Sequence, residues 1–224
     1  MTGRPPPAVL PPSLRVRLGL VAVLAALAVV VLGVLYAGHS ESGGLDSWII
    51  PPTADSVRPP WRHVAVALDF LGEPVGSVML VTVIVAGCLL LRRPRAAVLV
   101  VAGAAMAVGT ATLLKHLVGR TIHGADNLSF PSGHTTFFTA LALTVALLAT
   151  DRLGLGGTAG TSLVLAATLV AGAAMGWAEV ALGAHYPTDA LGGWCTALAV
   201  VPATAWLVDR IADRLADAGP RARR

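Results

Sequence analysis

The sequence has few charged residues. Only 12% of its 224 residues are Asp, Glu, Lys or Arg, and 55% are hydrophobic. An average soluble domain carries about 25% charged residues. This deficit, together with a mean hydropathy of +0.76, excludes a water-facing surface and indicates an integral membrane protein. The length suits one compact bundle rather than two domains.

Cysteine and lysine are also scarce. Cys88 and Cys195 lie in apolar stretches without the spacing of metal ligands, so we expect small buried side chains. Lys115 is the only lysine, and arginine supplies the remaining positive charge. The abundance of Ala, Val, Gly and Arg is typical of a GC-rich bacterial genome. We therefore expect a multi-pass protein of a bacterial inner (cell) membrane.

Six apolar stretches are long enough to cross a bilayer, which predicts an all-α membrane protein with a six-transmembrane-helix bundle. They cover residues 18–36, 75–91, 96–114, 135–150, 158–177 and 190–208. The first reaches about 28 Å and is longer than the core of a cleaved signal peptide, so we expect a retained helix.

The spans divide the chain into three regions. We expect a disordered cytoplasmic tail at residues 1–17, a six-helix transmembrane domain at 18–212 and a basic cytoplasmic tail at 213–224. The polar, proline-rich segment from His39 to Arg62 is expected to be a loop. Trp48 and Trp61 in this segment suggest contact with the membrane interface.

The positive charges predict the orientation in the membrane. Six spans place both termini on one side, and twelve of the sixteen Arg and Lys residues lie on that side. The other side carries Arg58, Arg62, Lys115 and Arg120. The positive-inside rule therefore predicts cytoplasmic termini. Residues 115–134 and 179–189 then share the outer face.

Small residues recur at a spacing of four, which lets helix backbones approach closely. The pairs are Gly156 with Gly160, Ala105 with Gly109, and Gly172 with Gly176. We favour packing within the bundle, with a homodimer interface as the alternative.

His185 and Asp189 are four residues apart, so a helix would place them on one face. Pro187 between them suits the first turn of a helix. A carboxylate bonded to one ring nitrogen fixes the tautomer and exposes the other nitrogen for attack. The alternative is a helix-capping Asp beside an interfacial His.

The segment Pro131-Ser132-Gly133-His134 precedes another apolar stretch. Ser132 can cap a helix there, and Gly133 allows a ligand to approach the backbone closely. Free N–H groups at a helix start attract phosphate, and His134 could protonate a leaving oxygen. A simple cap beside an interfacial His is the alternative.

Lys115 and Arg120 lie on the outer side, where the positive-inside bias depletes cations. Such residues are often anchors whose charged ends reach the interface. Because their side is depleted of positive charge, we favour phosphate binding, in which Arg grips two oxygens and Lys acts as a point charge.

Together these motifs resemble the type 2 phosphatidate phosphatase (lipid phosphate phosphatase) superfamily. That family has three signatures: Lys followed seven residues later by Arg-Pro; Pro-Ser-Gly-His; and Ser-Arg, five residues, His, three residues, Asp. This chain matches the second in full at residues 131–134, the end of the third at His185 and Asp189, and the Lys of the first at Lys115. The resemblance covers residues 96–206.

The resemblance implies a metal-independent phosphoric monoester or diphosphate hydrolase without a cofactor. His185 would attack phosphorus and form a phosphohistidine, oriented by Asp189. His134 would protonate the leaving group and then activate water. The phosphate oxygens would be held by Lys115, Ser132 and the Gly133 amide.

The expected substrate is a lipid phosphate or diphosphate at the outer leaflet. Candidates are a polyprenyl diphosphate, a polyprenyl phosphosugar, phosphatidylglycerol phosphate or phosphatidate. The expected partners are this substrate and membrane lipids, and nucleic acid is not expected.

Two departures from the family pattern concern phosphate binding. Ile122 and His123 stand where the family has Arg-Pro, and Ala178 and Glu179 stand where it has Ser-Arg. Charge-assisted bonds to phosphate contribute about 1.5–3 kcal/mol each. The loss of two arginines should therefore weaken binding of phosphate substantially.

Three interpretations follow from these departures. In the first, Arg120 fills the vacant place, assisted by His123, and Glu179 pairs with Arg120 or Lys115. Alternatively, the substrate supplies its own positive or hydrogen-bonding group. The third interpretation is a non-catalytic lipid-phosphate binding or transport protein with the same fold.

Overall fold

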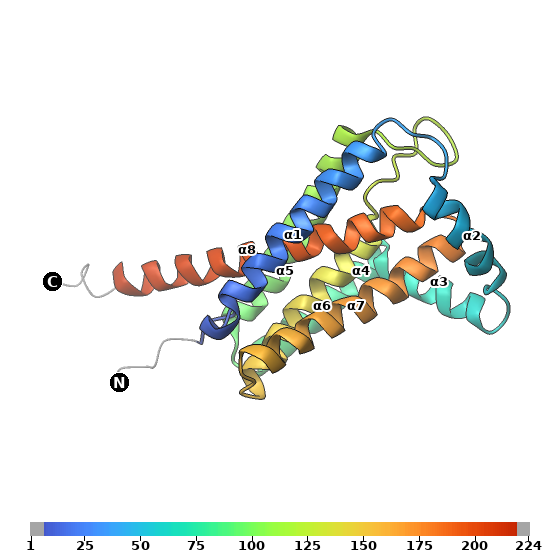
Figure 1. Ribbon diagram of the computed structural model, residues 1–224. Helices are drawn as coiled ribbons and strands as arrows, with labels where there is room; N and C mark the ends of the chain where they lie inside the picture. Colours follow the sequence, from blue (N-terminus) through green and yellow to red (C-terminus); the bar gives the residue numbers. More distant parts are fainter. Residues whose placement is uncertain (1–6, 219–224) are drawn as a thin grey trace.

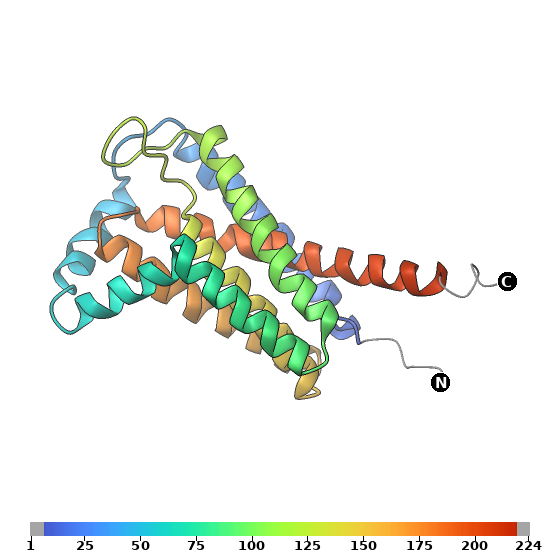
Figure 2. The ribbon, with the colours of Figure 1, turned by 180° about the vertical axis from the view of Figure 1, so that it is seen from behind.

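The computed structural model describes residues 7–218, which form eight α-helices and no β-strand (Figures 1 and 2). The predicted all-α fold is confirmed for these residues. The helices are α1 (Pro12–Leu35), α2 (Gly44–Asp55), α3 (Trp61–Gly72), α4 (Pro74–Leu90), α5 (Pro94–Val118), α6 (Gly133–Arg152), α7 (Gly157–Ala181) and α8 (Pro187–Ala218).

Five helices, α1, α5, α6, α7 and α8, are long and apolar enough to cross a membrane. α3 and α4 meet at a bend of 74° and add a sixth span if the pair is counted as one. α4 alone has 17 residues and reaches only about 26 Å, short of a typical bilayer core of about 30 Å. The expected span at 75–91 is therefore the longer arm of a broken helix.

Four helices begin at a proline: Pro12, Pro74, Pro94 and Pro187. Proline suits the first turn because its missing N–H would have no partner within the helix there. The predicted place of Pro187 in a first helical turn is confirmed.

The proline-rich segment 39–62 is not a continuous loop, contrary to expectation. α2 occupies Gly44–Asp55 and α3 follows it. α2 contains Pro51 and Pro52, packs against α7 and α8, and buries Asp46 completely. Packing against the bundle thus outweighs a low intrinsic helix propensity, which composition alone could not reveal.

The N-terminal segment is folded from residue 7, which corrects the expected disorder of residues 7–17. Val9 and Leu10 are buried, and their N–H groups donate to the buried carboxylate of Asp209 at 2.9 and 3.0 Å. Arg95 of α5 lies 3.5 Å from the same carboxylate. These contacts join three segments, the stretch before α1, α5 and α8, at the end of the bundle where α1 begins (Figure 1). Residues 1–6 of the expected tail lie outside the described residues.

α8 continues to Ala218, well beyond the expected end of the sixth span at residue 208. Asp213 on this extension pairs with Arg95 at 2.8 Å. Residues 213–218 are therefore helical, and the extension projects beyond the neighbouring helices (Figure 1). Residues 219–224 of the expected tail lie outside the described residues.

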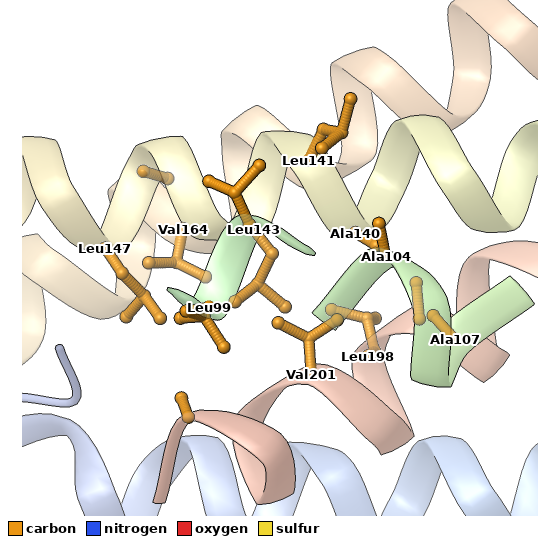
Figure 3. Packing of buried hydrophobic residues seen from close by; sticks show 14 of the residues in the cluster. Leu99, Ala104, Ala107, Ala140, Leu141, Leu143, Leu147, Val164, Leu198 and Val201 are labelled. Carbon is orange, nitrogen blue, oxygen red and sulfur yellow. The ribbon is translucent and has the colours of Figure 1, made fainter. Parts of the chain in front are cut away.

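The apolar core lies where α5, α6, α7 and α8 pack together (Figure 3). Leu99, Leu143, Val164 and Val201, one from each helix, are fully buried there. Because the lipid-facing surfaces are also apolar, close van der Waals packing rather than hydrophobic burial holds such helices together.

Two of the small-residue pairs pack within the bundle, as favoured above. A Cβ at Gly160 would lie 2.6 Å from Thr150, and one at Gly172 would lie 2.5 Å from Trp194. Gly109 has open space around the position of a Cβ. A homodimer contact at that face stays a prediction.

α8 packs closely against the start of α6 and the residue before it at Gly193. A Cβ at this position would lie 2.5 Å from the carbonyl oxygen of Ser132 and 3.1 Å from Oγ1 of Thr136. The absence of a side chain at Gly193 therefore allows α8 to contact the Pro-Ser-Gly-His segment.

We expect Gly193→Ala to destabilise the protein by about 1–3 kcal/mol, because the added methyl must push two backbones apart. Gly109→Ala, on an open face of α5, is the matched control and should be neutral or slightly stabilising. Thermal unfolding in detergent, followed by tryptophan fluorescence, measures both. Equal melting temperatures for the two variants would contradict the close approach.

Candidate active site

His134, Glu179 and His185 meet at the same end of the bundle. His134 lies in the first turn of α6, Glu179 in the last turn of α7, and His185 directly before α8. Oε2 of Glu179 lies 3.9 Å from Nδ1 of His134 and 3.6 Å from Nε2 of His185. The structure thus brings the two imidazoles together around a single carboxylate that is 1% exposed.

The opposite nitrogen of each ring also faces acidic side chains. Nδ1 of His185 lies 3.6 Å from Oδ2 of Asp189. Nε2 of His134 lies 3.9 Å from Oδ1 of Asp69 and 3.8 Å from Oε1 of Glu73. Both of these nitrogens are shielded from solvent and lack a hydrogen-bond partner. In each ring, therefore, one nitrogen faces the shared carboxylate of Glu179 and the other nitrogen lies near one or two further carboxylates.

Asp189 is fixed from three directions. Its Oδ2 accepts a hydrogen bond from the Tyr186 N–H at 3.0 Å, and its Oδ1 accepts one from Arg120 Nη1 at 2.7 Å. Its backbone carbonyl accepts a bond from the Ser132 N–H at 2.9 Å. The last bond connects the two histidine-bearing segments directly.

Arg120 is fully buried and is bound by protein oxygens. Nη2 donates to Asp46 Oδ2 at 2.6 Å, while Nη1 donates to Asp189 at 2.7 Å and to Thr188 Oγ1 at 2.6 Å. Asp46 in turn accepts bonds from the N–H and the hydroxyl of Thr188. The guanidinium therefore joins α2 to the start of α8.

Two aromatic rings cover this guanidinium. Its carbon lies 4.1 Å from the ring centre of Tyr36 and 4.2 Å from that of Tyr186, a cation–π arrangement. Burial raises the pKa of Tyr186, so its hydroxyl stays a neutral donor to the carbonyl oxygen of Ser40. Both terminal nitrogens of Arg120 thus donate to protein oxygens and both faces of the guanidinium are covered, an arrangement that argues against direct binding of phosphate by Arg120 in place of a missing arginine.

Residues 96–213, more than half of the chain, match the family model of the PAP2 superfamily. The chain belongs to the PAP2 superfamily. Its fold is similar to the crystal structure of a transmembrane PAP2-type phosphatidylglycerolphosphate phosphatase from Bacillus subtilis, with a TM-score of 0.63 and 22% sequence identity. The likeness covers 86% of this chain and 96% of that chain. No curated protein matches the sequence.

The PAP2 match confirms the resemblance drawn from the motifs, and it covers nearly all of α5 to α8. Four side chains of the site region come from outside the matched residues. They are Tyr36, Asp46, Asp69 and Glu73, supplied by the segment from α1 to the α3–α4 bend. The first four helices thus complete a site whose histidines lie in the PAP2 part.

Ser132 caps α6, as predicted. Its Oγ accepts a hydrogen bond from the Thr135 N–H at 3.2 Å and lies 3.1 Å from Thr135 Oγ1, to which it donates. The side chain is fully buried and its hydroxyl is bonded to Thr135, and the expected contact of Ser132 with phosphate stays a prediction. The amide of Gly133 lies at the open N-terminal end of α6 and stays a predicted phosphate donor.

Lys115 lies in the last turn of α5, and its Nζ donates to the Leu128 carbonyl oxygen at 2.7 Å. Its charge is close enough to act on Glu179 and Asp189. The expected pairing of Glu179 with Arg120 does not form, because both terminal nitrogens of Arg120 bind other acids. Lys115 therefore places a positive charge near Glu179 and Asp189, and its contact with phosphate stays a prediction.

His123 is exposed and lies in the loop between α5 and α6. Its Nε2 is 2.7 Å from the carbonyl oxygen of Gly183, so it links this loop to the segment before His185. Its predicted help in phosphate binding stays a prediction.

Sequence reasoning missed Asp69 and Glu73, on either side of the α3–α4 bend. Gly72 lets this bend lie against His134, because a Cβ at Gly72 would overlap the imidazole. Asp69, Glu73 and His134 converge closely enough to hold a metal ion. The only signal in the sequence is a pair of acids four residues apart before Pro74, which no motif connects to His134.

We expect Asp46→Asn to lower the melting temperature strongly, although Asp46 does not touch either histidine. Loss of one partner from a buried ion pair costs about 3–5 kcal/mol, because the remaining charge is left uncompensated. Asp55→Asn, at the exposed end of the same helix, is the matched control and should melt like the wild type. Thermal unfolding in detergent measures both variants, and unchanged melting of Asp46→Asn would argue against the network.

Proposed function

We propose that this chain is a membrane phosphatase that removes a phosphate or diphosphate group from a lipid through a phosphohistidine at His185. The observation that carries the proposal is the arrangement of His134 and His185 around one shared position at Glu179. Membership of the PAP2 superfamily supports hydrolysis of a phosphoric ester. Candidate substrates are a polyprenyl diphosphate, a polyprenyl phosphosugar, phosphatidylglycerol phosphate and phosphatidate.

In the first half of the reaction, Nε2 of His185 attacks phosphorus. Asp189, 3.6 Å from Nδ1, stabilises the positive charge that the ring gains. The bond between phosphorus and the leaving oxygen breaks, and His134 donates a proton to that oxygen from Nδ1. The products are a phosphohistidine and a free lipid alcohol, or a lipid phosphate when the substrate is a diphosphate.

In the second half, His134 takes a proton from a water molecule at the same nitrogen. The resulting hydroxide attacks the phosphorus of the phosphohistidine. The P–N bond breaks, inorganic phosphate leaves, and both histidines return to their starting forms. No metal ion is needed for either step.

Lys115 and the amides of Gly133 and His134 are the donors that we propose for the phosphate oxygens. Glu179 occupies the place of the missing arginine between the histidines. Two anions in contact inside the bundle repel each other strongly, so we propose that Glu179 is protonated when phosphate binds and donates a hydrogen bond to it.

We propose that the lipid tail lies in an apolar groove of about 330 Å³ between α2, α7 and α8. Val180 and Pro187 line this groove, and they are close in sequence to Glu179 and His185. A tail lying there would leave its phosphate near the two imidazoles. The charge bias of the sequence supports an orientation with this end outside a bacterial inner membrane.

The second candidate is a non-catalytic protein that binds or transports a lipid phosphate. The burial of Arg120 and the acid at position 179 favour this candidate, because few positive charges other than Lys115 are then left to bind the phosphate oxygens. The broken helix α3–α4 at the site is also a feature of transporters. This candidate predicts lipid binding that survives His185→Ala, without phosphate release.

Release of inorganic phosphate from a panel of the candidate lipids tests the proposal. We expect His185→Ala to abolish turnover and His134→Ala to slow it by about 10²–10⁴-fold, the usual contribution of a general acid–base group. His116→Ala, an exposed histidine on α5, is the matched control and should leave turnover unchanged. Wild-type rates in both active-site variants would overturn the mechanism.

An aryl phosphate distinguishes the role of His185 as nucleophile from that of His134 as acid and base, because its leaving group needs no proton. With ³²P-labelled aryl phosphate, His134→Ala should accumulate an acid-labile, alkali-stable label because its second half-reaction is blocked. His185→Ala should carry no label. Labelling at another residue would rule out His185 as the nucleophile.

We expect Gly72→Ala to lower kcat by about tenfold or more, because the methyl would push His134 out of line and small misplacements of a catalytic group are costly. Gly87→Ala, on an open face of α4, is its control. Phosphate release is measured alongside the melting temperature. A normal kcat in Gly72→Ala would show that the bend does not position His134.

A further inference from the structure

The α3–α4 bend places two acids against the back of His134. Asp69, Glu73 and His134 each offer one possible ligand atom, and these three atoms lie within 4.8 Å of one another. The distances from Nε2 of His134 to Oδ1 of Asp69 and Oε1 of Glu73 are 3.9 and 3.8 Å, too long for hydrogen bonds. The proposed reaction uses Nδ1 of His134, so this reaction does not explain why two acids gather at Nε2.

The spacing suits a tetrahedral metal ion. Zn²⁺ binds His nitrogen and carboxylate oxygen at about 2.0–2.2 Å, which sets two ligands of a tetrahedron about 3.4 Å apart. The two distances from Nε2 of His134, 3.9 and 3.8 Å, need to close by only a few tenths of an ångström, and the two carboxylate oxygens lie within 4.8 Å of each other. Glu73 is partly exposed and free to make this adjustment. One nitrogen with two carboxylates favours Zn²⁺ over Mg²⁺ or Ca²⁺, which prefer oxygen ligands alone.

Glu179 provides a second observation. Its side chain is 1% exposed, its Oε1 has no hydrogen-bond partner, and its Oε2 lies 3.9 Å from Nδ1 of His134. A histidine that binds metal through one nitrogen usually presents its other N–H to a carboxylate, which fixes the ring and its tautomer. Asp69 and Glu73 are also close enough to act electrostatically on Glu179. A cation would offset the negative charge of these three acids, of which Glu179 is buried and Asp69 and Glu73 are partly exposed.

We propose that Asp69, Glu73 and His134 bind a divalent transition-metal ion, with Zn²⁺ the best fit, and that the bound ion inhibits the enzyme. The site itself stands on the geometry alone, whereas the inhibition rests on the proposed phosphatase function. The ion binds between α3–α4 and α6, joining a segment outside the PAP2 match to the histidine of the Pro-Ser-Gly-His motif.

Inhibition follows from the number of protons that His134 can carry. In the proposed reaction, the ring keeps a proton on Nε2 while Nδ1 gives one up and later takes one back. A metal ion on Nε2 replaces that proton, which passes to solvent. The ring then holds its remaining proton on Nδ1 in both halves of the cycle, so it can neither protonate the leaving oxygen nor activate water.

Co²⁺ tests the binding, since its visible absorption reports tetrahedral coordination. Purified protein without a histidine tag is titrated with Co²⁺ in detergent, and then with Zn²⁺ as competitor. We expect one ion per chain in the wild type. Glu73→Gln should weaken binding by about tenfold or more, and Asp69→Asn/Glu73→Gln by about 100-fold or more, since even outer-shell changes cost 10- to 100-fold.

Asp126→Asn is the matched control, because Asp126 is an exposed carboxylate at the same end of the bundle and is not in the cluster. It should bind Co²⁺ like the wild type. Melting temperatures establish that each variant is folded, and the single change at partly exposed Glu73 keeps the test decisive if the double variant is unstable.

The second arm measures the rate of phosphate release with Zn²⁺ and with a chelator. For each variant, the rate with Zn²⁺ is divided by the rate of the same variant with chelator. We expect Zn²⁺ to lower the wild-type rate by about tenfold or more and to have little effect on the double variant. Equal Co²⁺ binding by wild type and double variant overturns the site. Binding without inhibition overturns the inhibitory role. If no lipid releases phosphate, the phosphatase proposal fails, while the Co²⁺ titration still decides the metal site.

Discussion

The position of the two histidines depends on one buried arginine. Arg120 binds Asp46 and Asp189 and lies between two tyrosine rings, so its charge is matched without solvent. A guanidinium presents donors in a rigid plane, which lets one residue hold two acids from separate helices in a defined geometry. Because Oδ2 of Asp189 lies 3.6 Å from Nδ1 of His185, fixing Asp189 also helps to position the proposed nucleophile. Arg120 is thus a structural centre of the site.

The site is more acidic than its proposed substrate would suggest. Asp69, Glu73 and Glu179 surround His134, and Lys115 is the neighbouring cation. An anionic phosphate enters such a place favourably only when protons or cations offset the acids. Protonation of Glu179 would provide one route. A metal ion bound at Nε2 of His134 by Asp69 and Glu73 would also offset this negative charge, but it would inhibit catalysis.

Hydrophobic length and motif spacing predicted much of the fold, because each transmembrane helix is a local feature of the sequence. The Pro187 start of α8 and the Ser132 cap of α6 were predictable for the same reason. The helix α2 was not, since it exists through packing on α7 and α8 despite two prolines. The buried ion pair of Arg120 was not predictable because its partner Asp46 lies far away in sequence. Asp69 and Glu73 reach His134 only through the α3–α4 bend, which no local pattern reveals.

The central claim is that His134 and His185 act on the same phosphorus atom. Vanadate adopts the five-coordinate geometry of phosphoryl transfer, so a structure with bound vanadate tests this claim most directly. The account predicts vanadium bonded to Nε2 of His185, with Nδ1 of His134 in hydrogen-bonding contact with the oxygen on the opposite side. Vanadate bound away from His185, or with His134 out of reach of the opposite oxygen, would contradict it.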